Sequence, residues 1–110
     1  MINKKTIELY KTLTQEQLNE IFIDSCENGY LEVVKYLLTS PELKEHADIH
    51  ANNDNGFRLA CVNGHLEVVK YLLTSPDLKE HANIHADNDY GFRWACARGL
   101  SNENFYPNKP

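Results

Sequence analysis

The sequence has no hydrophobic run that approaches the roughly 18 residues typical of a membrane-spanning helix, so no transmembrane segment is expected. Its three cysteines are few and odd in number, which argues against a secreted disulfide scaffold. Basic residues are also in deficit. The 11 Lys and Arg stand against 16 Asp and Glu, and the net charge of −5 argues against general nucleic-acid binding.

The first ten residues, MINKKTIELY, carry positive charge but no apolar segment, so we expect no secretory signal. The 110 residues amount to one domain at most. Composition therefore indicates a small acidic protein that keeps its thiols in a reducing compartment, and we expect a cytoplasmic location.

What the sequence does contain is an internal repeat. Residues 26–60 and 61–95 are two copies of a 35-residue unit that differ at seven positions, so 28 of 35 residues are identical. A third copy starts with CARG at residue 96 and then stops matching, and FIDSC at 22–26 aligns with FRLAC at 57–61. A diverged copy is thus expected before the two close ones.

Each copy predicts two helices. The first covers 57–63 and ends at Gly64, where glycine can take a left-handed conformation. The second has its apolar residues at helical spacing and stops at Ser75-Pro76. In the next segment Ala82, Ile84 and Ala86 alternate with polar residues, which favours a short extended hairpin arm.

The amino-terminal segment predicts a cap for the stack. Thr14 and Gln17 are spaced as a capping box, and a helix over 15–28 should follow. A shorter helix is expected before it. Its apolar side would carry Ile7, Leu9, Tyr10 and Leu13, with lysines on its other side.

A helix-turn-helix unit with a hairpin, repeated about every 33 residues, is typical of ankyrin repeats. NGFRLACVNGHLEVVKYLL at 55–73 is similar to the family's TPLHxAAxxGHxEVVKxLL, and ADIHA and ANIHA are similar to its ADVNA. The resemblance implies an all-α ankyrin-repeat solenoid with short hairpin loops, capping helices at the amino end and a truncated carboxy-terminal repeat. Asn55-Gly56 replaces the family's Thr-Pro, and Arg58 its His.

On this reading, residues 1–110 form a single ankyrin-repeat domain. Residues 1–25 hold the cap and a diverged first helix, 26–60 and 61–95 are the near-identical repeats, and 96–110 are an incomplete repeat and tail. The near-identity of the copies is similar in style to ankyrin arrays of large viruses or intracellular bacteria, which would place the protein in a host cytoplasm.

Three sets of residues recur at one-repeat spacing and invite a chemical role. The cysteines at 26, 61 and 96 occupy a small packed position of the family, and no CxxC pair accompanies them, so we expect buried apolar packing. His46 and His50, like His81 and His85, would share a helix face and could bind zinc. That segment instead favours loop or extended chain, where His50 and His85 would brace the hairpin or make it pH-sensitive.

Arg58 and Arg93 suit inter-repeat bracing, with the guanidinium bonded to backbone carbonyls or to Asp54 and Asp89. A contact with nucleic acid is the more specific alternative for these arginines, but the net negative charge of the chain argues against it. No glycine-rich phosphate loop, nucleophile elbow or carboxylate pair with an evident cleft is present. We therefore expect no enzyme activity, no cofactor, no metal, no nucleic acid and no membrane.

The resemblance implies a protein partner that binds the concave face, made of hairpin tips and first-helix ends. Of the seven differences between the close copies, three fall in this set and none in the second helix. An Asn- and Asp-rich surface should favour a basic or hydrogen-bonding partner. The expected partner-binding residues are Asn52, Asn53, Asp54, Asn55, Val62, Asn63, Asp87, Asn88, Asp89, Tyr90, Ala97 and Arg98.

The carboxy-terminal end offers an alternative. Phe92 and Trp94 lie in a copy that lacks a second helix, so either the tail with Leu100, Phe105 and Tyr106 covers them, or a second molecule does. The second case would give a homodimer, a self-associating structural protein. A small inhibitor or effector that blocks a host or immune enzyme is a further alternative.

Overall fold

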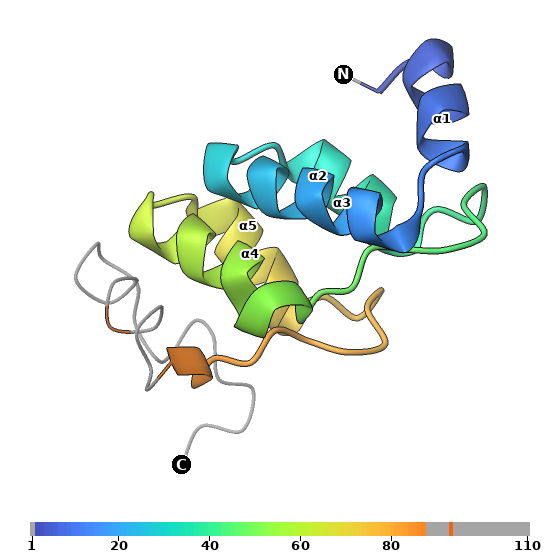
Figure 1. Ribbon diagram of the computed structural model, residues 1–110. Coiled ribbons are helices and arrows are strands. Elements are labelled where there is room, and N and C mark those ends of the chain that lie inside the picture. Colours follow the sequence, from blue (N-terminus) through green and yellow to red (C-terminus); the bar gives the residue numbers. More distant parts are fainter. Residues whose placement is uncertain (1, 88–92, 94–110) are drawn as a thin grey trace.

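The computed structural model describes residues 2–87 and Arg93. Its described part contains helices and no strand, arranged as a short solenoid (Figure 1). The helices are α1 (Lys4–Lys11), α2 (Gln15–Asn28), α3 (Leu31–Thr39), α4 (Ala51–Val62) and α5 (Leu66–Thr74).

The helices form two antiparallel pairs that stack side by side. α2 and α3 make the first repeat, and α4 and α5 make the second. α2 packs along α4 and α3 packs along α5, so the first helices form one layer and the second helices the layer behind it (Figure 1). The loops after α3 and α5 project from the same side of the stack. This confirms the all-α solenoid.

Local signals set where the helices begin and end. The Thr14 hydroxyl accepts the Gln17 amide at 3.1 Å, and the Gln17 side chain accepts the Thr14 amide at 2.9 Å. The predicted capping box is confirmed, and α2 has the predicted bounds. Gly29 and Gly64 have φ of 75° and 74°, the left-handed conformation that lets the chain turn straight into the second helix.

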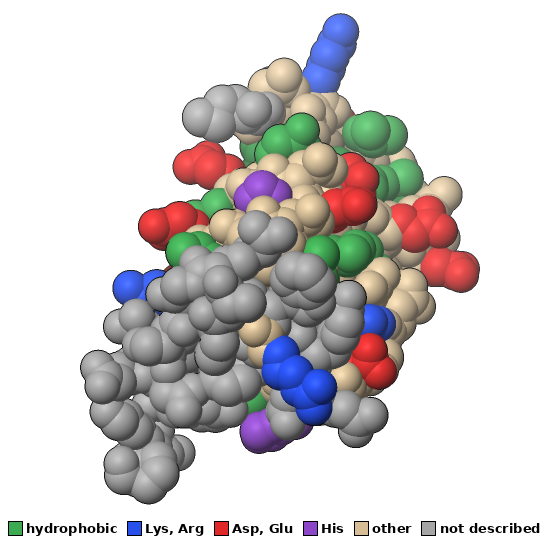
Figure 2. Space-filling view, turned by 90° about the vertical axis from the view of Figure 1, so that its left-hand side faces the viewer, with side chains coloured by type: hydrophobic (Ala, Val, Ile, Leu, Met, Phe, Trp, Pro, Cys, Tyr) green, Lys and Arg blue, Asp and Glu red, His purple; other side chains and the backbone are tan. Residues whose placement is uncertain are grey.

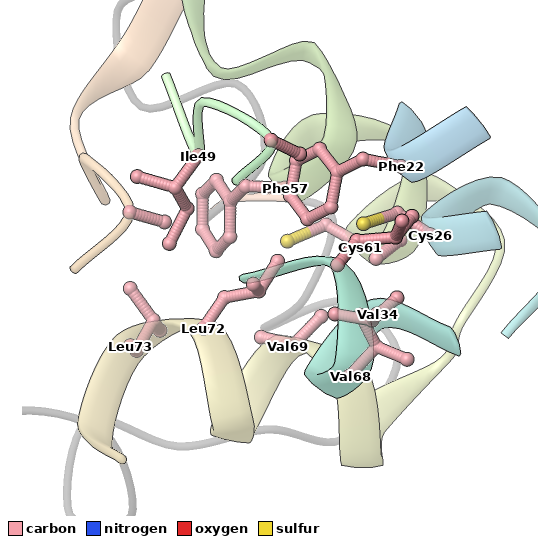
Figure 3. Close-up of a cluster of buried hydrophobic side chains, with 14 of the residues drawn as sticks. Phe22, Cys26, Val34, Ile49, Phe57, Cys61, Val68, Val69, Leu72 and Leu73 are labelled. Carbon is pink, nitrogen blue, oxygen red and sulfur yellow. The ribbon is translucent and has the colours of Figure 1, made fainter. Parts of the chain in front are cut away.

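The core lies between the two layers and runs through both repeats (Figure 3). Phe22 and Cys26 of α2 and their counterparts Phe57 and Cys61 of α4 are all 0% exposed. Burial raises the pKa of the Cys26 thiol, so the reactive thiolate is disfavoured. The two described cysteines thus act as apolar packing, and Cys96 lies outside the described residues.

The first helices approach so closely that α4 needs a glycine. A Cβ on Gly56 would lie 2.9 Å from the Phe22 ring and 3.1 Å from the Cys26 sulfur. Both distances are shorter than carbon and sulfur atoms tolerate without movement. This contact explains why glycine follows Asn55 at the start of the right-handed part of α4.

Some sequence expectations need correction. The first helix of the second repeat was expected over 57–63, but α4 begins at Ala51. Its residues 52–54 have φ of 55°, 59° and 56°, a left-handed turn in place of a hairpin tip. Ala82, Ile84 and Ala86 are buried in alternation as expected, yet no strand forms in this described segment. Leu9, expected on the apolar side of α1, is 55% exposed.

Candidate functional site

The left-handed turn at 52–54, at the start of α4, is the most distinctive feature of the backbone. Its residues are Asn and Asp, the non-glycine types that adopt this conformation most readily. The Asn52 and Asn53 side chains are exposed. Three consecutive left-handed residues persist only when surrounding contacts hold them in place.

Arg58 supplies part of that support. Its Nε donates to the Asn53 carbonyl at 3.1 Å, and its Nη2 donates to the Asn52 carbonyl at 3.3 Å. Its Nη1 also lies 3.7 Å from the Asp87 carboxylate of the next repeat. The expected bracing of carbonyls by Arg58 is confirmed. Its carboxylate partner is Asp87, whereas Asp54 was the expected one.

Asp54 points inward, which corrects its expected place on the partner surface. The residue is 4% exposed. Its Oδ2 accepts the backbone amide of Asn83 at 2.8 Å, and its two oxygens lie 3.1 and 3.0 Å from His50 Nδ1. A buried carboxylate needs such partners, since an unpaired charge is costly in the interior. We call this clip between α4 and the loop after α5 the second junction.

The same clip exists one repeat earlier in a neutral form. The Asn19 side-chain oxygen of α2 accepts the backbone amide of Asp48 at 2.7 Å. Asn19 and Asp54 hold equivalent positions, each bonded to an amide 29 residues further along the chain. Gln15, equivalent to His50, donates to the His46 carbonyl at 3.1 Å. We call this clip the first junction.

His50 completes the second junction. Its Nε2 lies 3.0 Å from the Glu80 carboxylate, and its backbone amide donates to the Asp48 side chain at 2.9 Å. Burial of the ring lowers the pKa of His50, but hydrogen bonds and charge from Asp54 and Glu80 outweigh it and raise the pKa above 6.5. The expected hairpin brace at position 50 is present.

The zinc alternative finds no supporting geometry. His46 Nε2 lies 2.7 Å from the Ser40 carbonyl, and His81 Nε2 lies 2.7 Å from the Ser75 carbonyl, so these rings secure their own loops. No group of three His, Cys, Asp or Glu suited to a metal ion occurs among the described residues. Within that same part of the chain, no helix is long and apolar enough to cross a membrane.

The other sequence-predicted site residues divide by exposure. Asn63 and Asp87 are exposed like Asn52 and Asn53, while Asn55 and Val62 are half-buried. Arg93 is exposed. The remaining predicted residues lie outside the described part of the chain: Asn88, Asp89, Tyr90, Phe92, Trp94, Ala97, Arg98, Leu100, Phe105 and Tyr106.

The structure adds an acidic stretch on α2 that the sequence analysis did not single out. Glu20, Asp24 and Glu27 are exposed along one side of this helix. Their equivalents on α4, 35 residues later, are Asn55, Leu59 and Val62, all half-buried. Comparing each residue of α2 with the residue 35 positions later in the sequence would have revealed this contrast. Figure 2 looks onto the side where α2 and α4 end, and there acidic side chains flank hydrophobic ones.

Comparison with known proteins identifies a family for this chain. The family model described as ankyrin repeats, in three copies, matches residues 7–86. No curated protein and no solved structure matches the chain. The family match covers more than half of the chain, and it includes both junctions and the left-handed turn.

Proposed function

The chain belongs to the ankyrin-repeat family, and from that premise we propose that it binds a partner protein through the face formed by α2, α4 and the turn at Asn52–Asn53. Ankyrin repeats are general protein–protein interaction modules, and proteins built from them are typically non-catalytic. We call this the recognition face. Its action is to occupy a partner surface, without chemistry.

The observation that carries this proposal is the support beneath the turn. Arg58 holds the carbonyls of Asn52 and Asn53, and both side chains remain exposed. A turn fixed in this way loses little conformational freedom when it binds, which favours affinity. Backbone strain of this kind occurs often at ligand-binding sites, which supports a recognition role for the two asparagines.

The recognition face is acidic along α2 and apolar along α4, and this supports a partner with complementary chemistry. α2 presents Glu20, Asp24 and Glu27, and no cation pairs with them among the described residues. α4 presents Leu59 and Val62 at the equivalent places. A partner with basic residues over α2 and an apolar contact over α4 would complement this face.

The test is affinity capture of the partner from the native source, followed by a binding titration with two charge-reversed variants. Glu20→Lys with Asp24→Lys changes the recognition face. Glu32→Lys with Glu67→Lys makes the same change in charge on exposed positions of α3 and α5. We expect the first pair to weaken binding about ten-fold or more and the second to change it about two-fold or less. Equal losses, or a loss only with the second pair, would overturn the proposal.

A further inference from the structure

His50 stands between two carboxylates that come from different parts of the stack. Its Nδ1 lies 3.0 Å from Asp54 Oδ2 on α4, and its Nε2 lies 3.0 Å from Glu80 Oε1 on the loop after α5. Ionised carboxylates only accept hydrogen bonds, so each ring nitrogen must carry a hydrogen to make both contacts. A neutral imidazole has one N–H and can satisfy only one of them.

We propose that His50 is a proton-operated latch between the second repeat and the loop that follows it. Protonated His50 holds Asp54 and Glu80 together, and loss of its proton releases Glu80. The release is at Glu80 because its side chain is 72% exposed, so water can replace the contact. The Asp54 side chain is 6% exposed and keeps the remaining N–H, since it would otherwise lose a partner in the interior.

The charges around the ring favour the protonated state. Two carboxylates contact the ring of His50, Asp54 on α4 and Glu80 on the loop after α5, while Asp48 on the preceding loop accepts the backbone amide of His50. The cation that α4 carries, Arg58, is directed to the Asn52 and Asn53 carbonyls and toward Asp87. The surroundings of the ring are therefore acidic on every side for which contacts are seen.

The direction of the pH effect follows from the raised pKa of His50. A group with a folded-state pKa above its unfolded value of 6.5 stabilises the folded state fully below that value. The stabilisation is lost as the pH rises through the folded pKa. The latch is thus closed in mildly acidic solution and opens as the pH rises through the raised pKa of His50.

The first junction provides the comparison within the same molecule. Gln15 occupies the position equivalent to His50 and bonds to a carbonyl through an amide that does not titrate. Glu45 occupies the position equivalent to Glu80, and it is exposed. These two residues supply matched controls, because His50→Gln copies the neutral junction and Glu45→Gln removes the same charge away from the latch.

The experiment is an NMR titration of the His50 ring in the full chain, carried out on the wild type, Glu80→Gln and Glu45→Gln. We expect a wild-type midpoint above 6.5, a lower midpoint in Glu80→Gln and an unchanged one in Glu45→Gln. A wild-type midpoint at or below 6.5, or equal effects of the two glutamine variants, would overturn the latch.

Thermal unfolding gives a second readout that does not involve a binding partner. His50→Gln should lower the unfolding temperature relative to the wild type at about pH 5.5, and the gap should narrow at about pH 9. A gap of the same size at both pH values contradicts the proposal. If His50→Gln fails to fold, the ring titrations of the wild type and Glu80→Gln still decide the question.

Discussion

The two junctions of the solenoid do the same structural task with different chemistry. At the first junction, Asn19 accepts the amide of Asp48 at 2.7 Å. At the second, Asp54 accepts the amide of Asn83 at 2.8 Å. The distance to the amide and the spacing of 29 residues are alike, but the acceptor is a neutral amide on a regular helix in one place and a buried carboxylate in a left-handed turn, paired with His50, in the other.

The difference between Asn19 and Asp54 separates the acceptor that stacking requires from the pH dependence that a carboxylate adds. Stacking needs an acceptor that reaches the amide of the next loop, and either side chain provides it. The carboxylate is more costly to bury and needs hydrogen-bond donors beside it, and because one donor is the titratable ring of His50, the second junction depends on the pH. The first junction carries no such dependence, since neither Asn19 nor Gln15 titrates.

The largest expected effect separates the two acceptors. Asp54→Ala leaves the backbone amide of Asn83 without its acceptor and removes one of the two carboxylates that contact the His50 ring, and we expect a loss of about 2–3 kcal/mol in unfolding free energy. Asn19→Ala removes one neutral hydrogen bond at a half-buried site, with an expected loss of about 1 kcal/mol. Urea denaturation of both variants measures the two values, and equal losses would mean that the junctions are energetically alike.

The next effect concerns the close approach of α2 and α4 at Gly56. Alanine is the better helix former, so Gly56→Ala would stabilise an uncrowded helix by about 1 kcal/mol. Because the new Cβ would press on Phe22 and Cys26, we expect a net loss of about 1–3 kcal/mol. Asn55→Ala, one residue earlier, serves as the control. A thermal unfolding midpoint that rises with Gly56→Ala would show that the repeats are less tightly stacked than the structure indicates.

A smaller effect should appear at the turn of the second repeat. Arg58→Ala removes the donors to two carbonyls and the neighbour of Asp87, with an expected loss of about 1 kcal/mol. Arg58→Lys keeps the charge but has no planar fork, so it should recover only part of the loss. Full recovery with lysine in chemical denaturation would show that charge, rather than the fork of donors, holds the turn.

The smallest effect lies on the second helices. The Lys35 ammonium sits 5.5 Å from the centre of the Tyr71 ring, a contact from the first repeat to the second. Lys35→Met keeps the aliphatic stem and removes the charge, and we expect a loss of about 0.5 kcal/mol. Lys44→Met, at an exposed loop position, is the control for charge alone. Identical unfolding free energies for the two variants would show that the contact between Lys35 and the Tyr71 ring adds no stability.

Much of the fold could be predicted because the signals that begin and end its helices are local in the sequence. The capping box at Thr14, the left-handed Gly64 and the stop at Ser75-Pro76 all act over a few residues, so a single sequence is enough to place them. The buried cysteines could be predicted for the same reason. Their spacing of one repeat indicates a position between stacked helices.

The candidate site depended on contacts that the sequence does not reveal. From the sequence, Asp54 is expected at a solvent-exposed turn. It points inward because its carboxylate accepts a backbone amide 29 residues away. The left-handed turn at 52–54 depends on Arg58 and on that same clip. The spacing of His46 and His50 suggested a metal pair. The pair that meets is instead His50 with Asp54, at the same spacing of four.

The most direct measurement is amide hydrogen exchange at Asp48 and Asn83, followed from about pH 6 to about pH 8 and corrected for intrinsic rates. These two amides are the donors of the first and second junctions. We expect protection of the Asn83 amide to fall as His50 loses its proton, because the loop that carries it is released at Glu80, while protection of the Asp48 amide stays constant. Protection that changes equally at both amides, or at neither, would contradict the proposed latch.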